Sequence, residues 1–284
     1  MNLKKMVLVL FVLLISPSIY SAPQYIDNSD YFVFKFNLDN DNLKLDLYSD
    51  TSGIAVSEVK SKVPRLVFAM NSALFDDTPV YKLVGLEVKT INRTSKVISS
   101  LVDPSTKTGN FSIHNQNVGG NGFLNNGVFF ITIRDYKFQA HILKYEDFKK
   151  IFYTDSNAAI HLDGYDYKIM AAVQSSPMIL VNNNNPNNKA SSNKLRRSGI
   201  GYSSDGKTII FISTKSDYNF YDLADLFSKY GASDALYLDG CTNSSLYIDK
   251  QKNLQITTGD SYAKCINAVP YNTKVAGTWV VTEK

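Results

Sequence analysis

The sequence predicts an α+β domain built on a mixed, largely antiparallel sheet with a few flanking helices. Three observations support this fold class. Short segments rich in β-branched and aromatic residues recur along the chain, Asn, Asp and Gly residues typical of turns separate them, and only two segments show helical periodicity. Sheet is therefore expected to dominate the structure.

The first twenty-odd residues have the pattern of a secretory signal. Lys4 and Lys5 precede an apolar run from Met6 to Ile15. A helix that crosses a bilayer needs about 20 apolar residues, so this run is too short for a permanent anchor. We expect residues 1–22 to be a signal peptide and residues 23–284 to form a single domain. The protein is then periplasmic or secreted, without stable membrane insertion once the signal is cleaved.

The predicted strands follow one another along the rest of the chain. Residues 31–37 and 43–48 flank an Asp- and Asn-rich turn, and the second segment alternates apolar and polar residues, which predicts a β-hairpin. Runs of β-branched and aromatic residues favour further strands. These strands are residues 65–70, 127–133, 170–174, 208–213 and 235–238.

Two segments have the periodicity of helices. After Asn219, apolar residues recur at i, i+3, i+4 and i+7 from Leu223, and Gly231 stands at the position of a C-cap. Residues 145–152 form a shorter candidate with apolar side chains on one face. The Asn-rich stretch at residues 182–189 is expected to be an exposed turn or loop that carries no chemistry.

Charge and composition exclude several classes of protein. The chain has 30 basic and 26 acidic residues, and without the two lysines of the signal the balance is 28 − 26 = +2. Such a balance argues against a nucleic-acid partner, which usually requires a clustered basic stripe. His114, His141 and His161 lack the spacing of a zinc site, and neither a P-loop nor a Gly-x-Ser-x-Gly elbow occurs. No metal or cofactor is expected.

The chain contains two cysteines, Cys241 and Cys265. In an oxidising compartment they can form a disulfide, which would stabilise the fold by about 3 kcal/mol. Two separate buried thiols are equally compatible with the sequence, because the sequence does not give the distance between them. The disulfide is therefore one of two open alternatives.

Four polar clusters stand at the ends of predicted strands, around Asn71, Gln174, Arg197 and Asp239. Strand ends are where rigid scaffolds place working side chains. Taken singly, each cluster has a structural explanation, such as a turn, a backbone cap or a surface ion pair. Taken together, a carboxylate, an arginine, amide side chains and small-residue backbone amides can bind a sugar phosphate.

In order and residue type, these clusters resemble the phosphodiester glycosidase family, over roughly residues 65–250, and look especially like its bacterial periplasmic branch. Ala73 and Ser176 stand where the family pattern has Gly, and the added Cβ atoms can narrow a pocket. The matching segments are Asn71–Phe75, Pro79 with Gly85-Leu86, Asn126–Phe129, Gln174–Pro177, Arg197–Gly201 and Leu238–Asn243.

The resemblance implies a hydrolase that cleaves an N-acetylglucosamine-like sugar from a sugar-1-phosphodiester in a glycan or envelope polymer. Asp239 would act as nucleophile or as base for water, and Arg197 would clamp the departing phosphate bidentately. Glu87 is the second candidate carboxylate. The implied substrate-binding residues are Asn71, Gln174, Ser176, Gly240 and Asn243.

Two other classes of function are weighed against this one. A non-catalytic module could hold a glycan through the same cleft, using tyrosine side chains as platforms. A protease-like enzyme could use Ser176 as nucleophile, but it would need a base, and no histidine lies in or beside the clusters. Release of free sugar would distinguish the glycosidase from the binding module.

Overall fold

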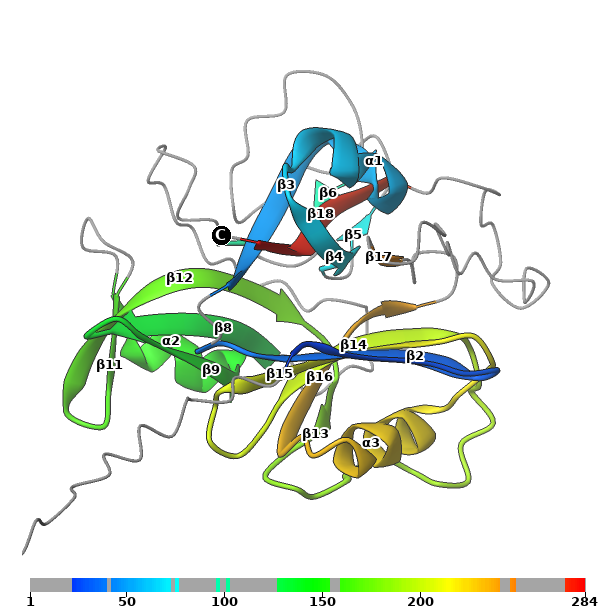
Figure 1. Ribbon diagram of the computed structural model, residues 1–284. Helices are drawn as coiled ribbons and strands as arrows, with labels where there is room; N and C mark the ends of the chain where they lie inside the picture. The colour runs from blue at the N-terminus through cyan, green and yellow to red at the C-terminus, as the bar shows by residue number, and fades with distance from the viewer. Residues whose placement is uncertain are drawn as a thin grey trace, which may run out of the picture.

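The computed structural model of the chain describes residues 22–39, 42–72, 75–76, 96–97, 101–102, 127–153, 159–240, 246–248 and 274–283. In this part of the chain strands dominate and only three short helices occur (Figure 1). The predicted sheet-rich fold is confirmed. Every strand pairing among these residues is antiparallel, so the structure described here gives no support for a mixed sheet.

Sheet 1 has six strands in the order β1-β2-β15-β14-β16-β13. Helix α3 (Phe220–Lys229) packs on one of its faces (Figure 1). The strands of sheet 1 are β1 (Gln24–Asp27), β2 (Tyr31–Asn37), β13 (Met178–Leu180), β14 (Arg197–Tyr202), β15 (Thr208–Thr214) and β16 (Asp234–Gly240).

Sheet 2 has the order β10-β11-β12-β8-β9, with β7 pairing with β12 as well. Helix α2 (Tyr145–Ile151) packs against it. The strands of sheet 2 are β7 (Leu101–Val102), β8 (Gly127–Arg134), β9 (Lys137–Lys144), β10 (Phe152–Tyr153), β11 (Ala159–Leu162) and β12 (Tyr165–Ser175).

Sheet 3 has the order β17-β4-β18-β3 and carries helix α1 (Val56–Lys62). It forms the upper part of the molecule in Figure 1. Its strands are β3 (Leu43–Ala55), β4 (Leu66–Asn71), β17 (Leu246–Ile248) and β18 (Lys274–Glu283), and a separate two-stranded sheet joins β5 (Phe75–Asp76) to β6 (Lys96–Val97).

One central hydrophobic core joins the three large sheets. Phe68 of sheet 3 stacks on Phe34 of sheet 1, with ring centroids 4.3 Å apart, and also contacts Phe211. Phe129 of sheet 2 makes an edge contact with Trp279 of sheet 3 at 5.2 Å. The three sheets are therefore held together by aromatic side chains from segments far apart in the sequence.

Each large sheet also packs a helix on its outer face, which explains why several strands are apolar throughout. In β15, Ile209 and Phe211 belong to the central core, whereas Ile210 and Ile212 face α3. Successive side chains of a strand point to opposite faces, so a strand buried on both faces reads as a continuous apolar run. This is why residues 208–213 were recognisable as a strand from sequence.

The predicted hairpin of residues 31–37 and 43–48 is wrong. β2 pairs with β1 and β15 in sheet 1, whereas β3 pairs with β18 in sheet 3. The physical reason is burial: β2 has apolar residues on both faces, and it lies between the central core and the cluster around α3. A strand buried on both sides is stabilised by distant partners, which the pattern of a local turn cannot show.

The two predicted helices are confirmed. Asn219 caps α3, because its side-chain oxygen accepts a 2.7 Å hydrogen bond from the backbone N–H of Asp222. Gly231 has φ +87°, the left-handed conformation expected after a helix C-terminus. α2 ends at Ile151, one residue before the predicted end, and α1 was not predicted.

The Asn-rich loop is exposed, as predicted, but it is attached to the fold by its own amides. Asn185 donates hydrogen bonds to the backbone oxygen of Tyr221 (3.0 Å) and to Asp225 (2.8 Å), and Asn187 donates to the backbone oxygen of Ile179 (2.6 Å).

Among the helices that the structure describes, none is both long and apolar enough to cross a membrane.

His141, in β9, is held in its neutral form by burial. Its ring stacks on Phe130 with centroids 4.9 Å apart, and its Nε2 lies 3.0 Å from the hydroxyl of Thr132. Burial lowers the pKa of His141 to about 4, against an opposing effect of the Asp163 carboxylate. An unfolded histidine has a pKa of about 6.5. Below that pH, the unfolded chain binds a proton that the folded protein does not bind until about pH 4.

The protein is therefore expected to lose stability as the pH falls from 6.5 toward 4, by up to about 3 kcal/mol from this residue. In His141→Gln, the free energy of unfolding lost between about pH 7.5 and about pH 4.5 should be smaller than in the wild type by about 2 to 3 kcal/mol. Urea denaturation at both pH values measures the effect. His161→Gln, which removes the exposed imidazole paired with Asp166, is the control. Equal pH slopes for the wild type and His141→Gln would contradict the prediction.

Candidate active site

The four polar clusters predicted at strand ends meet at one junction of the three large sheets. Arg197 at the start of β14 pairs with Gly240 at the end of β16. Next to Arg197, Ser198 exchanges hydrogen bonds of 3.1 and 3.2 Å with the side chain of Asn71 at the end of β4. Ser175 at the end of β12 donates to the backbone oxygen of Leu238 in β16 (3.1 Å). Strands from three sheets therefore end together here.

A β-bulge shapes the end of β16 at this junction. Gly199 pairs with Tyr237 and Arg197 with Gly240, so two residues of β16, Leu238 and Asp239, lie opposite the single residue between Gly199 and Arg197. Such a bulge bends a strand and redirects its end, and bulges are common beside active sites. The main chain of Asp239, the predicted catalytic carboxylate, forms part of this bulge. Its side chain lies outside the described part of the structure.

Gly240 is required by the close approach of the neighbouring chain. A Cβ atom at this position would lie 2.4 Å from the backbone oxygen of Arg196 and 2.5 Å from the hydroxyl of Tyr237. Neither distance is sterically possible, so any larger residue would displace the start of β14. This is a structural reason for the glycine, in addition to the substrate-binding role predicted for it.

Arg197 is almost completely buried, with 2% of its surface exposed. Its Nε donates to the backbone oxygen of Tyr218 (2.8 Å), one Nη donates to that of Asn193 (2.9 Å), and the guanidinium lies 3.8 Å from the ring centroid of Phe220. Burial lowers the pKa of Arg197, while the neighbouring Tyr237 and the charge of Asp217 act in the opposite direction.

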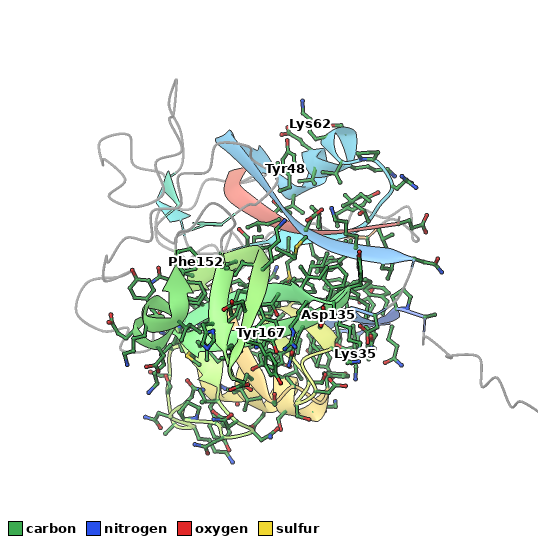
Figure 2. All side chains as sticks on the ribbon, turned by 90° about the vertical axis from the view of Figure 1, so that its left-hand side faces the viewer. Lys35, Tyr48, Lys62, Asp135, Phe152 and Tyr167 are labelled. Atoms are coloured by element: carbon green, nitrogen blue, oxygen red, sulfur yellow. The ribbon has the colours of Figure 1, made fainter. Side chains whose placement is uncertain are left out.

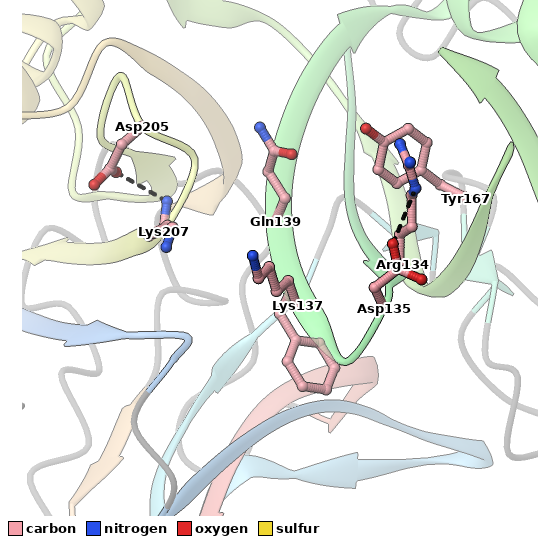
Figure 3. A pocket seen from close by; sticks show the side chains of 8 residues that line it. Arg134, Asp135, Lys137, Gln139, Tyr167, Asp205 and Lys207 are labelled. Carbon is pink, nitrogen blue, oxygen red and sulfur yellow. Dashed lines mark hydrogen bonds and ion pairs between the residues drawn. The ribbon is translucent and has the colours of Figure 1, made fainter. Parts of the chain in front are cut away.

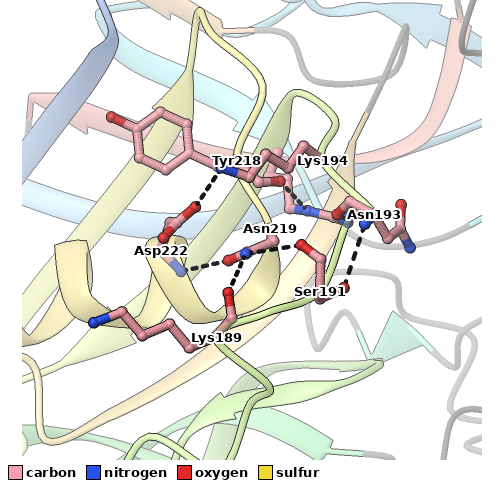
Figure 4. Close-up of polar contacts among 8 residues, drawn as sticks. Lys189, Ser191, Asn193, Lys194, Tyr218, Asn219 and Asp222 are labelled. Atoms are coloured by element: carbon pink, nitrogen blue, oxygen red, sulfur yellow. Dashed lines mark hydrogen bonds and ion pairs between the residues drawn. The ribbon is translucent and has the colours of Figure 1, made fainter.

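These contacts connect Arg197 to the network at the start of α3 (Figure 4). The amide of Asn219 donates to the backbone oxygens of Lys189 and Ser191, and the hydroxyl of Ser191 accepts from the backbone N–H of Asn193. Lys194 and Asp222 form an ion pair of 3.6 Å beside it. Arg197 thus fixes the segment that leads into β14 to the N-terminus of α3.

Arg197 and Asn71 lie on opposite sides of β14. Successive side chains of a strand alternate between its faces. Arg197 points toward Phe220 on the α3 side, and the next residue, Ser198, points to Asn71. The structure therefore brings the two segments together but does not bring these two side chains onto one face. Contact between Arg197 and a departing phosphate stays a prediction, and the observed geometry gives this residue a structural role.

Gln174 provides a hydrogen-bond donor that has no partner within the described residues. Its side chain is 2% exposed, and its Nε2 makes no hydrogen bond to any of these residues. A buried amide without a partner costs about 1 to 3 kcal/mol, so this donor is available to a ligand or to an ordered water. Ser176 and Asn71 are also fully buried. The candidate binding residues of the described chain are therefore internal, beneath the strand ends.

Several predicted residues lie outside the described residues: Glu87, Asn243, Cys241 and Cys265, together with the signal segment of residues 1–21. Their predicted roles, including the disulfide, stay predictions. Among the residues that the structure describes, no three His, Cys, Asp or Glu side chains gather where they could hold a metal ion.

Two residues of the junction were missed by the sequence analysis. Ser198 holds Asn71, and Tyr237 lies beside both Arg197 and Gly240. Ser198 lies inside the matching segment Arg197–Gly201, and Tyr237 directly precedes the matching segment Leu238–Asn243. The alternation of side chains along a strand could have indicated that Ser198 faces away from Arg197. Only the pairing of β14 with β16 shows which residues Ser198 and Tyr237 contact.

The fold and junction define a sheet-rich domain whose candidate site is formed by strand ends and small-residue turns. The sequence model of the phosphodiester glycosidase family matches residues 67–282, about three quarters of the chain. The chain belongs to the phosphodiester glycosidase family, a class of hydrolases. The resemblance inferred from the motifs is thereby confirmed. No curated protein matches the sequence.

One solved structure shows a related fold, and two further structures are similar to a lesser degree. The catalytic domain of zebrafish N-acetylglucosamine-1-phosphodiester alpha-N-acetylglucosaminidase, auto-inhibited by its pro-peptide, has a TM-score of 0.52 and 13% identity, over 93% of this chain and 82% of that chain. A protein from Synechocystis has a TM-score of 0.46 and 13% identity, over 92% of this chain and 61% of that chain. A protein from Burkholderia pseudomallei has a TM-score of 0.47 and 10% identity, over 92% and 75%.

Proposed function

We propose that this protein hydrolyses a sugar-1-phosphodiester, releasing an N-acetylglucosamine-like sugar from a glycan or an envelope polymer. The observation that carries the proposal is the junction of β4, β12, β14 and β16, where the family-matching segments around Asn71, Gln174, Arg197 and Asp239 meet. The name of the similar zebrafish enzyme describes a substrate of this chemical class.

The chemistry of such a substrate suits the residues present. Hydrolysis breaks the bond between the anomeric carbon and the phosphate oxygen, the oxygen of water becomes the new hydroxyl of the sugar, and the phosphate leaves as a monoester. A phosphate monoester is a weak base, so little help from a general acid is needed. Asp239 attacks the anomeric carbon directly or removes a proton from the attacking water.

The other candidate residues are given the following roles in this proposal. Gln174 offers its free Nε2 to a sugar hydroxyl or an acetamido oxygen, because this donor has no partner among the described residues. Asn71, Ser176 and Asn243 complete the set of substrate-binding residues, and Glu87 is the second carboxylate. Arg197 acts as a positioning residue, since its pairing with Gly240 fixes the end of the strand that carries Asp239.

Incubation of the purified protein with an N-acetylglucosamine-1-phosphodiester tests the proposal. Free sugar and phosphate monoester, measured together by mass spectrometry, are the expected products, in equal amounts. A glycan-binding module would retain the diester unchanged over the same period. If the protein binds the diester but releases no product at any pH tried, the hydrolase hypothesis is wrong and the glycan-binding module is favoured.

We also propose that the protein is exported and works in the periplasm or outside the cell. The support is the pattern of residues 1–22, in which two lysines precede an apolar run too short for a membrane anchor. An extracellular position fits a substrate in envelope glycans. Sequencing the N-terminus of the protein from its native cells tests this, since an intact Met1 in the bulk of the protein would overturn it.

A further inference from the structure

A second pocket lies at the opposite end of the sheets from the candidate active site. It has a volume of about 390 Å³ and is formed by the β8–β9 hairpin, by β12 and by the turn that follows β14 (Figure 3). β8 begins at Gly127, which pairs with Ser175 near the junction, and ends at Arg134 in the pocket. Seven steps along an extended strand span about 23 Å, so the two sites are separate.

The pocket is lined by three cations, and the acids beside them already have partners. Arg134 pairs with Asp135 at 3.4 Å, and Asp205 accepts hydrogen bonds from Ser203 and from the backbone N–H of Lys207. Lys137 forms no ion pair with any residue that the structure describes. Lys137 is therefore the cation of this pocket whose ammonium group is available to an anionic group of a ligand.

Lys207, on the other side of the pocket, is held at its place by Asp39, with 2.6 Å between Nζ and the carboxylate oxygen. Figure 3 shows Lys207 and Asp205 across the pocket from Arg134 and Asp135, with Lys137 and Gln139 between them. The cationic side chains thus come from the β8–β9 hairpin and from the turn that follows β14, and they line the same pocket.

Two exposed tyrosines, Tyr165 and Tyr136, lie next to residues that line the pocket. The guanidinium of Arg134 stacks on the ring of Tyr165 at 3.6 Å from its centroid and lies 5.6 Å from that of Tyr167. Tyr165 is 52% exposed, and Tyr136, at the tip of the hairpin, is 95% exposed. Exposed tyrosines arranged around a cation provide apolar faces for the C–H side of a sugar ring and hydroxyls for its polar edge.

Beside the pocket, the turn that follows β14 is packed closely on β9. Gly206 has φ +70°, and its backbone oxygen accepts a 2.8 Å hydrogen bond from the N–H of Ala140. A Cβ atom at Gly206 would lie 2.6 Å from Cγ of Gln139. The turn and β9 therefore fit together without free space, and the pocket exists before any ligand binds, which reduces the ordering cost of binding.

We propose that this pocket is an accessory site for an acidic saccharide, that is, a sugar bearing a carboxylate or a phosphate group. Lys137 and Arg134 bind the anionic group, Tyr165 stacks on the ring, and the side chains of Gln139 and Asp205 accept hydrogen bonds from sugar hydroxyls. These acceptors favour a saccharide over a nucleic-acid backbone, because a saccharide offers many hydroxyl donors and a phosphodiester backbone offers few. The site requires no hydrolysis and does not rest on the proposed function.

NMR titration of the isotope-labelled protein tests the proposal, because it locates a weak ligand. The probes are tetragalacturonate, maltotetraose with one 6-phosphate, and unmodified maltotetraose. We expect at least one acidic probe to shift the amide signals of Tyr136, Lys137 and Gly206, and to bind at least about tenfold more tightly than the neutral probe. Which acidic probe binds identifies the anionic group.

Charge-reversing variants locate the site. Lys137→Glu should lower the affinity for the acidic probe by at least about tenfold, and added salt should lower the affinity of the wild type for it. Lys62→Glu is the matched control, since Lys62 is an exposed lysine of α1 in a different part of the molecule (Figure 2). The proposal is overturned if no acidic probe binds, or if the neutral probe binds as tightly as the acidic probes. It is also overturned if Lys137→Glu and Lys62→Glu lower the affinity equally, or if a short single-stranded oligonucleotide shifts the same amide signals more strongly.

Discussion

Replacing Asp239 by Asn is expected to lower the rate of sugar release by at least about a thousandfold, while the protein stays folded. The amide cannot attack the anomeric carbon or take a proton from water, and removal of a reacting carboxylate commonly costs this much or more. Because Asn has nearly the same volume as Asp, the bulge of β16 between Leu238 and Gly240 should be preserved. The loss should therefore appear in kcat more than in KM.

Steady-state kinetics on an N-acetylglucosamine-1-phosphodiester, together with thermal denaturation, measures the effect of this substitution. Asp225→Asn is the matched control, since Asp225 is an exposed carboxylate of α3 that accepts a hydrogen bond from Asn185, and Asn can still accept it. Undiminished turnover in Asp239→Asn would remove Asp239 from the mechanism. A parallel fall in melting temperature would instead indicate a structural role.

Replacing Trp279 by Ala is expected to destabilise the protein by about 3 to 5 kcal/mol. Trp279 is completely buried in β18, pairs with Met70 of β4 and with Leu47 of β3, and makes an edge contact with Phe129 of sheet 2. Truncation therefore leaves a cavity where sheets 2 and 3 meet. Its surroundings are β-strands fixed by their own hydrogen bonds, so the cavity cannot close easily.

Trp279→Phe is the matched control for this prediction. The indole Nε1 has no hydrogen-bond partner among the residues that the structure describes, so losing the N–H should cost little. We expect Phe to retain the ring contact with Phe129 and to lose less than about half of the stability that Ala loses. Urea denaturation followed by circular dichroism measures both variants. A loss below about 1 kcal/mol for Trp279→Ala would contradict a role in joining the sheets.

Local patterns predicted the elements that are stabilised locally. The segment from Asn219 to Gly231 carries its own cap, its own apolar stripe and its own terminating glycine, so α3 could be predicted from this segment alone. β15 was recognised because apolar residues on both faces made it a continuous apolar run. By contrast, β14 contains Ser198 and two glycines and was seen only as a polar cluster, although it is a central strand.

The candidate site was predicted as a set of segments but not as a set of facing side chains. The segments around Asn71, Gln174, Arg197 and Asp239 do meet. Arg197 points toward Phe220 and Ser198 points toward Asn71, and this alternation along β14 is not contained in the motifs. Motif matching identifies residues, whereas the face that each residue occupies depends on strand register.

By itself, the sequence determined the family, the dominance of strands, the helices α2 and α3, and the residues from which a site would be assembled. These features depend on residue type and on spacings within a few turns or strand positions. Only the tertiary structure decided which strands pair and that β2 and β3 belong to different sheets. It also decided that the Arg197 side chain is buried on the α3 side of β14. Pairing is decided by the burial of both faces of a strand against partners distant in the chain, and no local pattern contains that information.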